Sequence, residues 1–197
     1  MVKIELGGGP IPLAGFINID CFEHPKVNRV VDLNTERLPF EDDSVDEIYS
    51  SHCLEHLDPV KGYVHCLEEM YRVSKPNILW KIKVPYAHTH HTVANPFHIN
   101  NRFNEFTFSF FSATHKSCGN TLVRKGSISE FWIKCTLEVE SIEYGYFPEF
   151  KYLIDEPESV QQATRMKYWN VVDEIRYSIR VIKPDFWTQE RKRLGLE

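Results

Sequence analysis

The sequence predicts an α/β fold in which a mostly parallel β-sheet lies between helices, giving three layers. Two observations lead to this class. Four short apolar runs within the first 52 residues each end in glycine or polar side chains, and an amphipathic helical pattern follows the fourth run. The chain has 197 residues, of which 42% are apolar, enough for a sizeable core. We therefore expect residues 1–197 to form a single domain.

Residues 2–6 form the first expected strand, since apolar and polar side chains alternate there, and the chain then enters Gly7, Gly8 and Gly9. A glycine-rich turn at the end of a strand lets a ligand approach the backbone closely. Such a turn is also common without any ligand, so the neighbouring strands have to decide between these two interpretations.

The second and third expected strands end in carboxylates. Residues 16–19 run into Asp20, and residues 29–31 run into Asp32. Nucleotide-binding sheets place an acidic side chain at the end of a second strand to hold ribose hydroxyls, although an aspartate can also simply begin a turn. Together with the glycines, the two carboxylates favour a nucleoside ligand. Roughly ten residues separate Gly9 from Asp20, too few for a crossover helix, so a short loop is expected there.

The stretch at residues 38–57 combines a turn, a short strand at residues 45–49 and a cluster of ionisable groups. Ligands of open α/β sheets bind beyond the carboxyl ends of the strands. The polar side chains in that position are Ser51, His52, Glu55 and His56. Chemistry is therefore expected directly after this strand.

A core-facing helix is expected next. Residues 60–71 repeat apolar side chains at helical spacing, with Asp58 as N-cap and Pro59 at the first helical position. A fifth strand follows at residues 78–84. Lysines on one face of this strand are unexpected for a strand that is buried on both faces.

With these pieces in order, the first half of the chain resembles the class I S-adenosylmethionine (SAM) dependent methyltransferases, especially the small type 11 group. The resemblance rests on Glu5-Leu6-Gly7-Gly8-Gly9 as an E-x-G-x-G loop, on Asp20 and Asp32, and on residues 38–57 and 69–76. It implies a Rossmann-like sandwich with antiparallel edge strands, and SAM as the cofactor. Ile11 stands where many members have a third glycine, and Asn77-Ile78 replaces a common Gly-Gly pair.

The resemblance also implies roles for single residues. The glycine turn would lie against the methionine part of SAM, the first aspartate would hold the ribose, the residues after the third strand would meet the adenine, and those after the fourth would flank the sulfonium. In that order, the expected cofactor-binding residues are Glu5, Gly7, Gly8 and Gly9, then Asp20, then Asp32 and Leu33, then Ser51 and His52.

A polar segment without regular period follows the fifth strand and contains His88, His90, His91 and His98. In the resembling family this region reaches over the acceptor pocket, so residues 86–130 are expected to form a lid. The alternative is a surface loop whose histidines are solvated. We predict that His98 faces His52 and His56 on the acceptor side of the cofactor pocket, and that these three histidines are catalytic.

The C-terminal half is expected to complete the sheet. A phenylalanine-rich helix at residues 103–111 and a mobile loop at 112–129 precede alternating apolar residues at 133–146. The alternation changes phase near Glu140, which predicts a bulge in an antiparallel edge strand. Residues 159–183 place apolar side chains at helical spacing and predict an amphipathic helix, packed on the sheet or on a second copy in a dimer.

Composition limits the partners. A net charge of −5 argues against broad neutralisation of nucleic-acid phosphates and favours a small-molecule partner. Five cysteines without C-x-x-C spacing predict neither a disulfide framework nor a cysteine zinc site, which fits a reducing cytoplasm. There is no signal-peptide pattern and no run of about 18 apolar residues, so a soluble monomer or homodimer is expected.

The leading functional hypothesis is a methyltransferase that moves the methyl group of SAM to a small-molecule O or N acceptor. Because the sulfonium is already activated, the protein would mainly supply alignment, with a histidine to remove the acceptor proton. A nicotinamide-dependent oxidoreductase is one alternative, but Pro12 breaks the G-x-G-x-x-G pattern. A SAM-binding module without catalysis is another.

Residues 52–56 also spell H-x-x-E-H, a zinc metalloprotease pattern. That pattern needs one continuous helix, whereas here His52 directly follows a strand and Pro59 stops a helix early. Some RNA and quinone methyltransferases that the chain resembles hold a divalent ion at E-x-x-E-H, which suggests a metal-assisted enzyme acting on a nucleic-acid end or a catechol-like acceptor. His52 would replace the first glutamate there, and His88, His91 or His98 would add a ligand. We predict an acceptor site without a metal.

Overall fold

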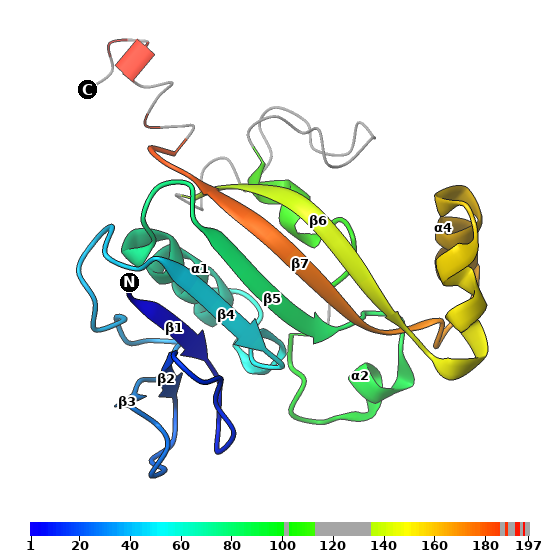
Figure 1. Ribbon diagram of the computed structural model, residues 1–197, viewed down its shortest axis with the longest axis horizontal. Helices are drawn as coiled ribbons and strands as arrows, with labels where there is room; N and C mark the ends of the chain where they lie inside the picture. Colours follow the sequence, from blue (N-terminus) through cyan, green and yellow to red (C-terminus); the bar gives the residue numbers. More distant parts are fainter. Residues whose placement is uncertain (101–102, 113–134, 186–187, 189–191, 194, 196–197) are drawn as a thin grey trace.

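The computed structural model describes residues 1–100, 103–112, 135–185, 188, 192–193 and 195. It contains a seven-stranded sheet in the order β3-β2-β1-β4-β5-β7-β6 (Figure 1). The strands are β1 (Lys3–Leu6), β2 (Ile17–Asp20), β3 (Arg29–Val30), β4 (Glu47–Ser51), β5 (Leu79–Pro85), β6 (Thr136–Tyr146) and β7 (Val172–Ile182). The first five pair in parallel, and β7 runs antiparallel to both β5 and β6. The predicted α/β class, with a mostly parallel sheet and antiparallel edge strands, is confirmed.

The helical elements are η1 (Leu54–His56), α1 (Lys61–Val73), α2 (His90–Ala94), η2 (Thr107–Phe111), η4 (Pro148–Asp155) and α4 (Glu158–Lys167). Helix α1 connects β4 to β5 and begins two residues after Pro59. Asp58 Oδ1 accepts hydrogen bonds from the backbone N–H groups of residues 60, 61 and 62. Asp58 thus caps the start of the helix, as predicted, but Pro59 lies in the turn before the helix and not at its first position.

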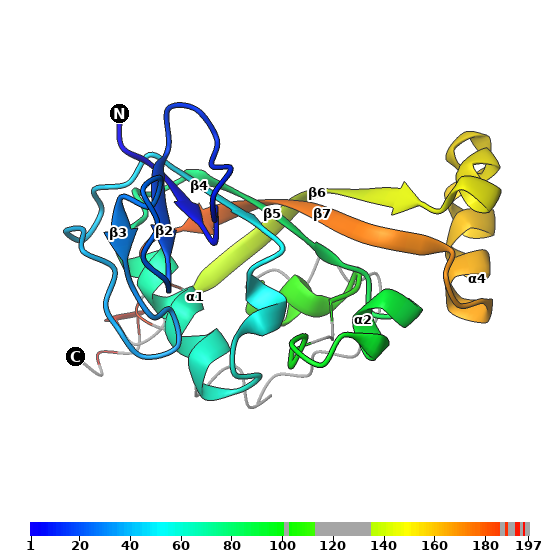
Figure 2. The same cartoon turned by 90° about the horizontal axis from the view of Figure 1, so that it is seen from below.

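Helices α1 and α2 lie on one face of the sheet. Figure 2 shows α1 and α2 below it, while the β1–β2 loop rises on the other side. The connections β1–β2, β2–β3 and β3–β4 contain no helix in the described chain, so the described residues form two of the three predicted layers. The first crossover is a short loop, as predicted.

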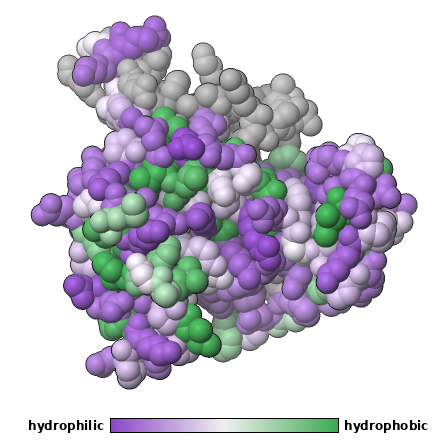
Figure 3. All heavy atoms as spheres, viewed as in Figure 1, coloured by the Kyte–Doolittle hydropathy of each residue, from purple (hydrophilic) through white to green (hydrophobic). Residues whose placement is uncertain are grey.

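The uncovered face of the sheet carries charged side chains, and Figure 3 shows mainly hydrophilic residues over its centre. Glu47 forms ion pairs with Lys3 at 2.7 Å and with Lys81 at 3.0 Å, and Lys83 pairs with Glu174 at 2.8 Å. The lysines that look misplaced for a doubly buried strand thus point away from the helices.

The predicted helix at residues 159–183 is wrong beyond residue 167, where the chain turns into β7. Ile175, Tyr177, Ile179 and Val181 are buried and repeat every second residue, so this segment fits a strand as well as a helix. Pairing on both sides, with β5 and β6, uses its backbone groups and favours the strand.

The predicted bulge in β6 is confirmed, since the register with β7 shifts between Val139 and Ser141. The predicted helix at residues 103–111 is only a short 3-10 helix, η2. Of the predicted mobile loop at 112–129, all but Ser112 lies outside the described residues, as do residues 101–102 and 113–130 of the predicted lid.

The described cysteines, Cys21, Cys53, Cys66 and Cys135, are free thiols. In the part of the chain that the structure describes, no helix has the length and apolar character needed to cross a membrane.

Candidate active site

The glycine turn after β1 fits closely against its neighbours. Gly7 and Gly9 have φ angles of +70° and +54°, in the left-handed region that glycine adopts most easily. A Cβ atom at Gly7 would lie 2.6 Å from Cys53 Cβ, and one at Gly8 would lie 2.5 Å from Asn18 Oδ1. A Cβ atom at Gly9 would meet nothing within 4 Å. The turn therefore packs on the protein at Gly7 and Gly8 and is open at Gly9.

Two buried polar side chains hold the loop that follows the turn. Glu5 Oε2 accepts a hydrogen bond from Leu13 N at 2.6 Å, and burial raises the pKa of the Glu5 carboxyl. Asn18 Nδ2 donates to Gly9 O and to Lys26 O, both at 2.9 Å. Sequence reasoning missed Asn18, although a polar residue inside the apolar run of β2 is a signal for it.

Asp20 ends β2 and is buried beside the glycine turn. Its Oδ2 accepts a hydrogen bond from Gly9 N at 2.9 Å, and its Oδ1 accepts one from Cys21 N at 2.7 Å. A carboxylate offers about four acceptor positions, so each oxygen retains one for a further donor. Asp20 can thus support the turn and still accept hydrogen bonds from a ligand.

Asp32 starts a turn after β3. It accepts hydrogen bonds from Asn34 N at 2.9 Å, Asn34 Nδ2 at 3.0 Å and Thr35 Oγ1 at 3.1 Å, and the bonds from Asn34 lower the pKa of the Asp32 carboxyl. Leu33 is buried. The structure thus gives Asp32 the turn-forming role that the sequence left open for it.

The chain changes direction after β4 at His52, whose φ angle is +51°. The imidazole lies between two carboxylates, with Nδ1 3.4 Å from Glu55 Oε1 and Nε2 3.3 Å from Glu174 Oε2. The interaction with Glu55 raises the pKa of His52, and that with Glu174 adds to it. Glu174 comes from β7, so no local sequence signal points to it.

Glu55, His56 and His98 form a compact cluster beside His52. The Glu55 side chain is fully buried, and neither of its oxygens has a hydrogen-bond partner. The rings of His56 and His98 are 4.9 Å apart and meet edge to face. One metal-ligating atom from each of the three residues lies within 4.8 Å of the others. Asn100 N donates to Glu55 O at 2.9 Å, which keeps the segment carrying His98 beside η1.

The other histidines of the expected lid lie elsewhere. The His88 ring is 5.9 Å from that of Trp169, and His91 Nδ1 is 3.3 Å from Asp173 Oδ1. The side chain of Asn170 lies within 3.1 Å of both ring nitrogens of His90. Of the lid histidines, the structure therefore brings His98 to His56 and takes the other three toward residues 169–173.

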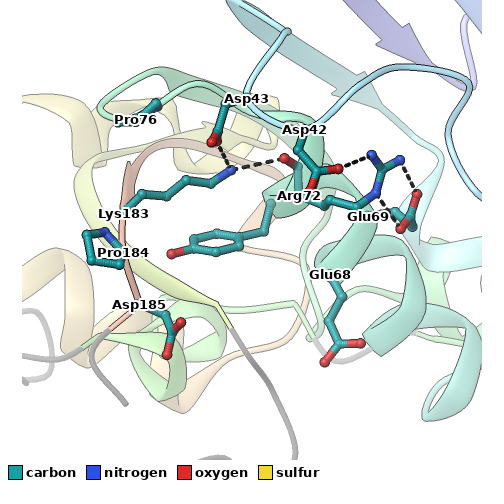
Figure 4. A pocket seen from close by; sticks show the side chains of 10 residues that line it. Asp42, Asp43, Glu68, Glu69, Arg72, Pro76, Lys183, Pro184 and Asp185 are labelled. Carbon is teal, nitrogen blue, oxygen red and sulfur yellow. Dashed lines mark hydrogen bonds and ion pairs between the residues drawn. The ribbon is translucent and has the colours of Figure 1, made fainter. Parts of the chain in front are cut away.

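A separate cavity of about 610 Å³ lies at the opposite end of the strands from the glycine turn (Figure 4). Residues that come before β4, before β5 and after β7 line it. Arg72 pairs there with Asp42 and with Glu69, each at 2.7 Å, and Lys183 pairs with Asp43. Both basic side chains of this cavity are thus already paired with carboxylates of the protein. We therefore place the candidate site at the glycine turn, beyond the carboxyl ends of β1, β2 and β4.

The arrangement combines two functions. The glycine turn and Asp20 offer backbone and carboxylate groups suited to a nucleoside ligand. His52, Glu55, His56 and His98 offer groups that can accept a proton or bind a cation.

Comparisons with known proteins agree with this geometry. Residues 18–78 match a family described as a methyltransferase domain, and no curated protein matches the chain. A SAM-dependent methyltransferase from Archaeoglobus fulgidus shares the fold, with a TM-score of 0.54 and 16% identity over 91% of this chain and 85% of that one. One from Methanosarcina mazei has a TM-score of 0.51 and 12% identity, over 91% and 92%. The cyclase SpnF has a TM-score of 0.50 and 12% identity, over 91% and 74%. The family match thus covers residues 18–78, and the solved structures show that the whole described chain has the fold of SAM-dependent methyltransferases.

Proposed function

We propose that this protein is an active methyltransferase that transfers the methyl group of SAM to an oxygen or nitrogen atom of a small molecule. The observation that carries the proposal is the buried Asp20 carboxylate bonded to Gly9 N, with open space beside Gly9. The His56–His98 pair lies beyond the end of β4, the strand that pairs with β1. A cofactor-holding group and proton-accepting groups thus occur at the same end of the sheet.

The cofactor would lie along the turn of Gly7, Gly8 and Gly9, with the free acceptor positions of Asp20 toward the ribose hydroxyls. Glu5 would act indirectly, because its side chain holds the loop after the glycine turn through the hydrogen bond from Leu13 N. Leu33 and Asp32 would border the adenine, and Ser51 and His52 the sulfonium. Asp32 would act there through the turn that it forms, because its oxygens already accept three hydrogen bonds.

When bound, SAM supplies an electrophilic methyl group, whose bond to sulfur breaks as the bond to the acceptor forms. The residues of the chain then have to align the acceptor and take its proton. Burial lowers the pKa of His98, which favours the neutral imidazole that can accept a proton near neutral pH. We assign this role to the histidines at positions 52, 56 and 98.

Calorimetry and thermal unfolding with SAM, S-adenosylhomocysteine, NAD and NADP test the cofactor. We expect SAM and S-adenosylhomocysteine to bind and to raise the unfolding temperature, and NAD and NADP to do neither. Stabilisation by NAD alone would refute the proposal.

A SAM-binding module without methyl transfer is the second candidate, favoured by one observation: the fold is shared with SpnF, whose name describes a cyclase and not a methyltransferase. Incubation with methyl-labelled SAM and panels of hydroxy and amino compounds separates the two candidates. Labelled product that disappears in His56→Ala, while SAM still binds, supports the enzyme. Binding without turnover across O and N acceptors supports the module.

A further inference from the structure

We propose that Glu55, His56 and His98 bind a divalent transition-metal ion such as Zn²⁺. This goes beyond the proposed methyl transfer, for which no metal is needed, and it replaces the expectation of a metal-free site. Glu55 and His56 are adjacent in η1, and His98 approaches them from the segment after α2.

The Glu55 carboxylate is buried with little compensation for its charge. It is fully buried, and both oxygens lack a hydrogen-bond partner. Burying a carboxylate is unfavourable unless it is paired or bound to a metal. The His52 ring lies 3.4 Å away from Oε1 without the alignment of a hydrogen bond, and its own side chain is 44% exposed. Both Glu55 oxygens are therefore available to bind a cation.

His56 is already in the tautomer that a metal ligand needs. Its Nδ1 lies 2.9 Å from Phe97 O, and a carbonyl oxygen can only accept, so Nδ1 carries the proton. The lone pair is therefore on Nε2. Metal-binding histidines usually donate their other N–H to a carbonyl or carboxylate in this way, which fixes both the tautomer and the ring orientation.

His98 supplies the third ligand. Its Nδ1 is buried without a hydrogen-bond partner, and its ring packs edge to face on that of His56. A metal ion between the three side chains would give a partner to a ring nitrogen of His98 and to a carboxylate oxygen of Glu55. The ligating atoms lie within 4.8 Å of one another, and ligands sit at about 2.0 to 2.2 Å from Zn²⁺, so modest rotations bring them together.

The ligand set selects the type of ion. Two imidazoles and one carboxylate suit Zn²⁺, Fe²⁺ or Co²⁺, whereas Mg²⁺ and Ca²⁺ prefer oxygen ligands. Three protein ligands leave a coordination position for water or for an oxygen of a bound molecule. Where both proposals hold, His56 and His98 serve as ligands and His52 remains to take the acceptor proton.

The test uses the whole chain after removal of metals with a chelator. Titration with Co²⁺ should give the visible absorption of a tetrahedral site at one ion per chain, and Zn²⁺ should compete for it. His98→Gln and Glu55→Gln should weaken Zn²⁺ binding by about 100-fold or more. His91→Gln, a lid histidine outside the cluster, is the matched control and should bind like the unchanged protein.

Thermal unfolding keeps the test independent of activity. Zn²⁺ should raise the unfolding temperature of the unchanged chain and of His91→Gln, but not that of His98→Gln. In the metal-free state Glu55→Gln should unfold at a higher temperature than the unchanged chain, because it removes a buried charge whose oxygens have no hydrogen-bond partner. Equal Zn²⁺ affinity in His98→Gln and His91→Gln, or no stoichiometric binding, would overturn the site.

SAM affinity, measured on the same samples, separates this proposal from the proposed function. Loss of SAM binding with intact Zn²⁺ binding would refute the methyltransferase and leave the metal site standing. Normal SAM binding without Zn²⁺ binding would refute the metal site and leave the proposed methyltransferase standing.

Discussion

The backbone N–H of Gly9 donates a hydrogen bond to Asp20 Oδ2 at 2.9 Å. One buried carboxylate therefore links the turn after β1 to the end of β2. Strand pairing already places Leu6 beside Ile19, and this hydrogen bond holds the glycine turn against the end of β2.

Asp20→Ala should weaken SAM binding about tenfold or more. A hydrogen bond to a charged group contributes roughly 1.5 to 3 kcal/mol, and the variant also frees the glycine turn. Calorimetry gives the dissociation constant, and circular dichroism checks the fold. Asp20→Asn, which keeps one acceptor oxygen, should lose less. An unchanged affinity in a folded Asp20→Ala protein would show that the ribose lies elsewhere.

Gly7→Ala should destabilise the protein by about 2 to 4 kcal/mol, since the new methyl group would meet Cys53 Cβ at 2.6 Å and the left-handed backbone adds strain. Gly15→Ala is the matched control. Gly15 has a φ angle of +85° but open space around it, so only the strain of about 1 kcal/mol applies. Urea unfolding measures both variants. Equal losses would mean that packing against Cys53 contributes nothing.

The ion pair of Glu69 and Arg72 should make stability depend on pH. Glu69 accepts from Arg72 Nε at 2.8 Å, Arg72 Nη2 at 2.7 Å and Leu38 N at 2.9 Å. Burial alone would raise the pKa of Glu69, but these bonds and the Arg72 charge outweigh it and lower the pKa below the ordinary glutamate value of 4.5. The resulting stabilisation is present above about pH 4.5 and is lost as the pH falls through the folded-state pKa.

Glu69→Gln should therefore reduce the free energy of unfolding at pH 7 by about 2 kcal/mol, and by much less at pH 3. Glu23→Gln, at an exposed position, should change little at either pH. Denaturant unfolding at the two pH values gives both differences. A loss that is the same at pH 3 and pH 7 would contradict an electrostatic origin.

Arg165→Met should loosen α4, which projects from the end of the β6–β7 pair in Figure 1. The Arg165 side chain is 1% exposed. Its guanidinium pairs with Glu158 at 2.6 Å, donates to Tyr146 at 2.9 Å and lies 3.9 Å from the centre of the Tyr144 ring. Hydrogen exchange should speed up across residues 148–167, with a local loss of about 2 to 3 kcal/mol. The control is Lys167→Met, at the exposed last residue of α4, which should leave the hydrogen-exchange rates unchanged.

Local features of the fold could be predicted from the sequence, because they depend on neighbouring residues. Alternation in residues 2–6 and the following glycines predict β1 and its turn. The cap at Asp58 predicts the start of α1, and the phase change near Glu140 predicts the bulge in β6. Each depends on backbone geometry within a few residues, so no knowledge of distant contacts is required.

Features that depend on distant pairing were decided only by the tertiary structure. Residues 168–182 satisfy both helical and strand periods, and two neighbouring strands supply the hydrogen bonds that select the strand. The contact between His52 and Glu174 arises because β7 returns antiparallel beside β5. The sequence offered several lid histidines as partners for His56, and the hydrogen bond from Asn100 N to Glu55 O brings His98 to it. Spacing along the chain contains no information on which of these groups meet, because loop paths and sheet order set those distances.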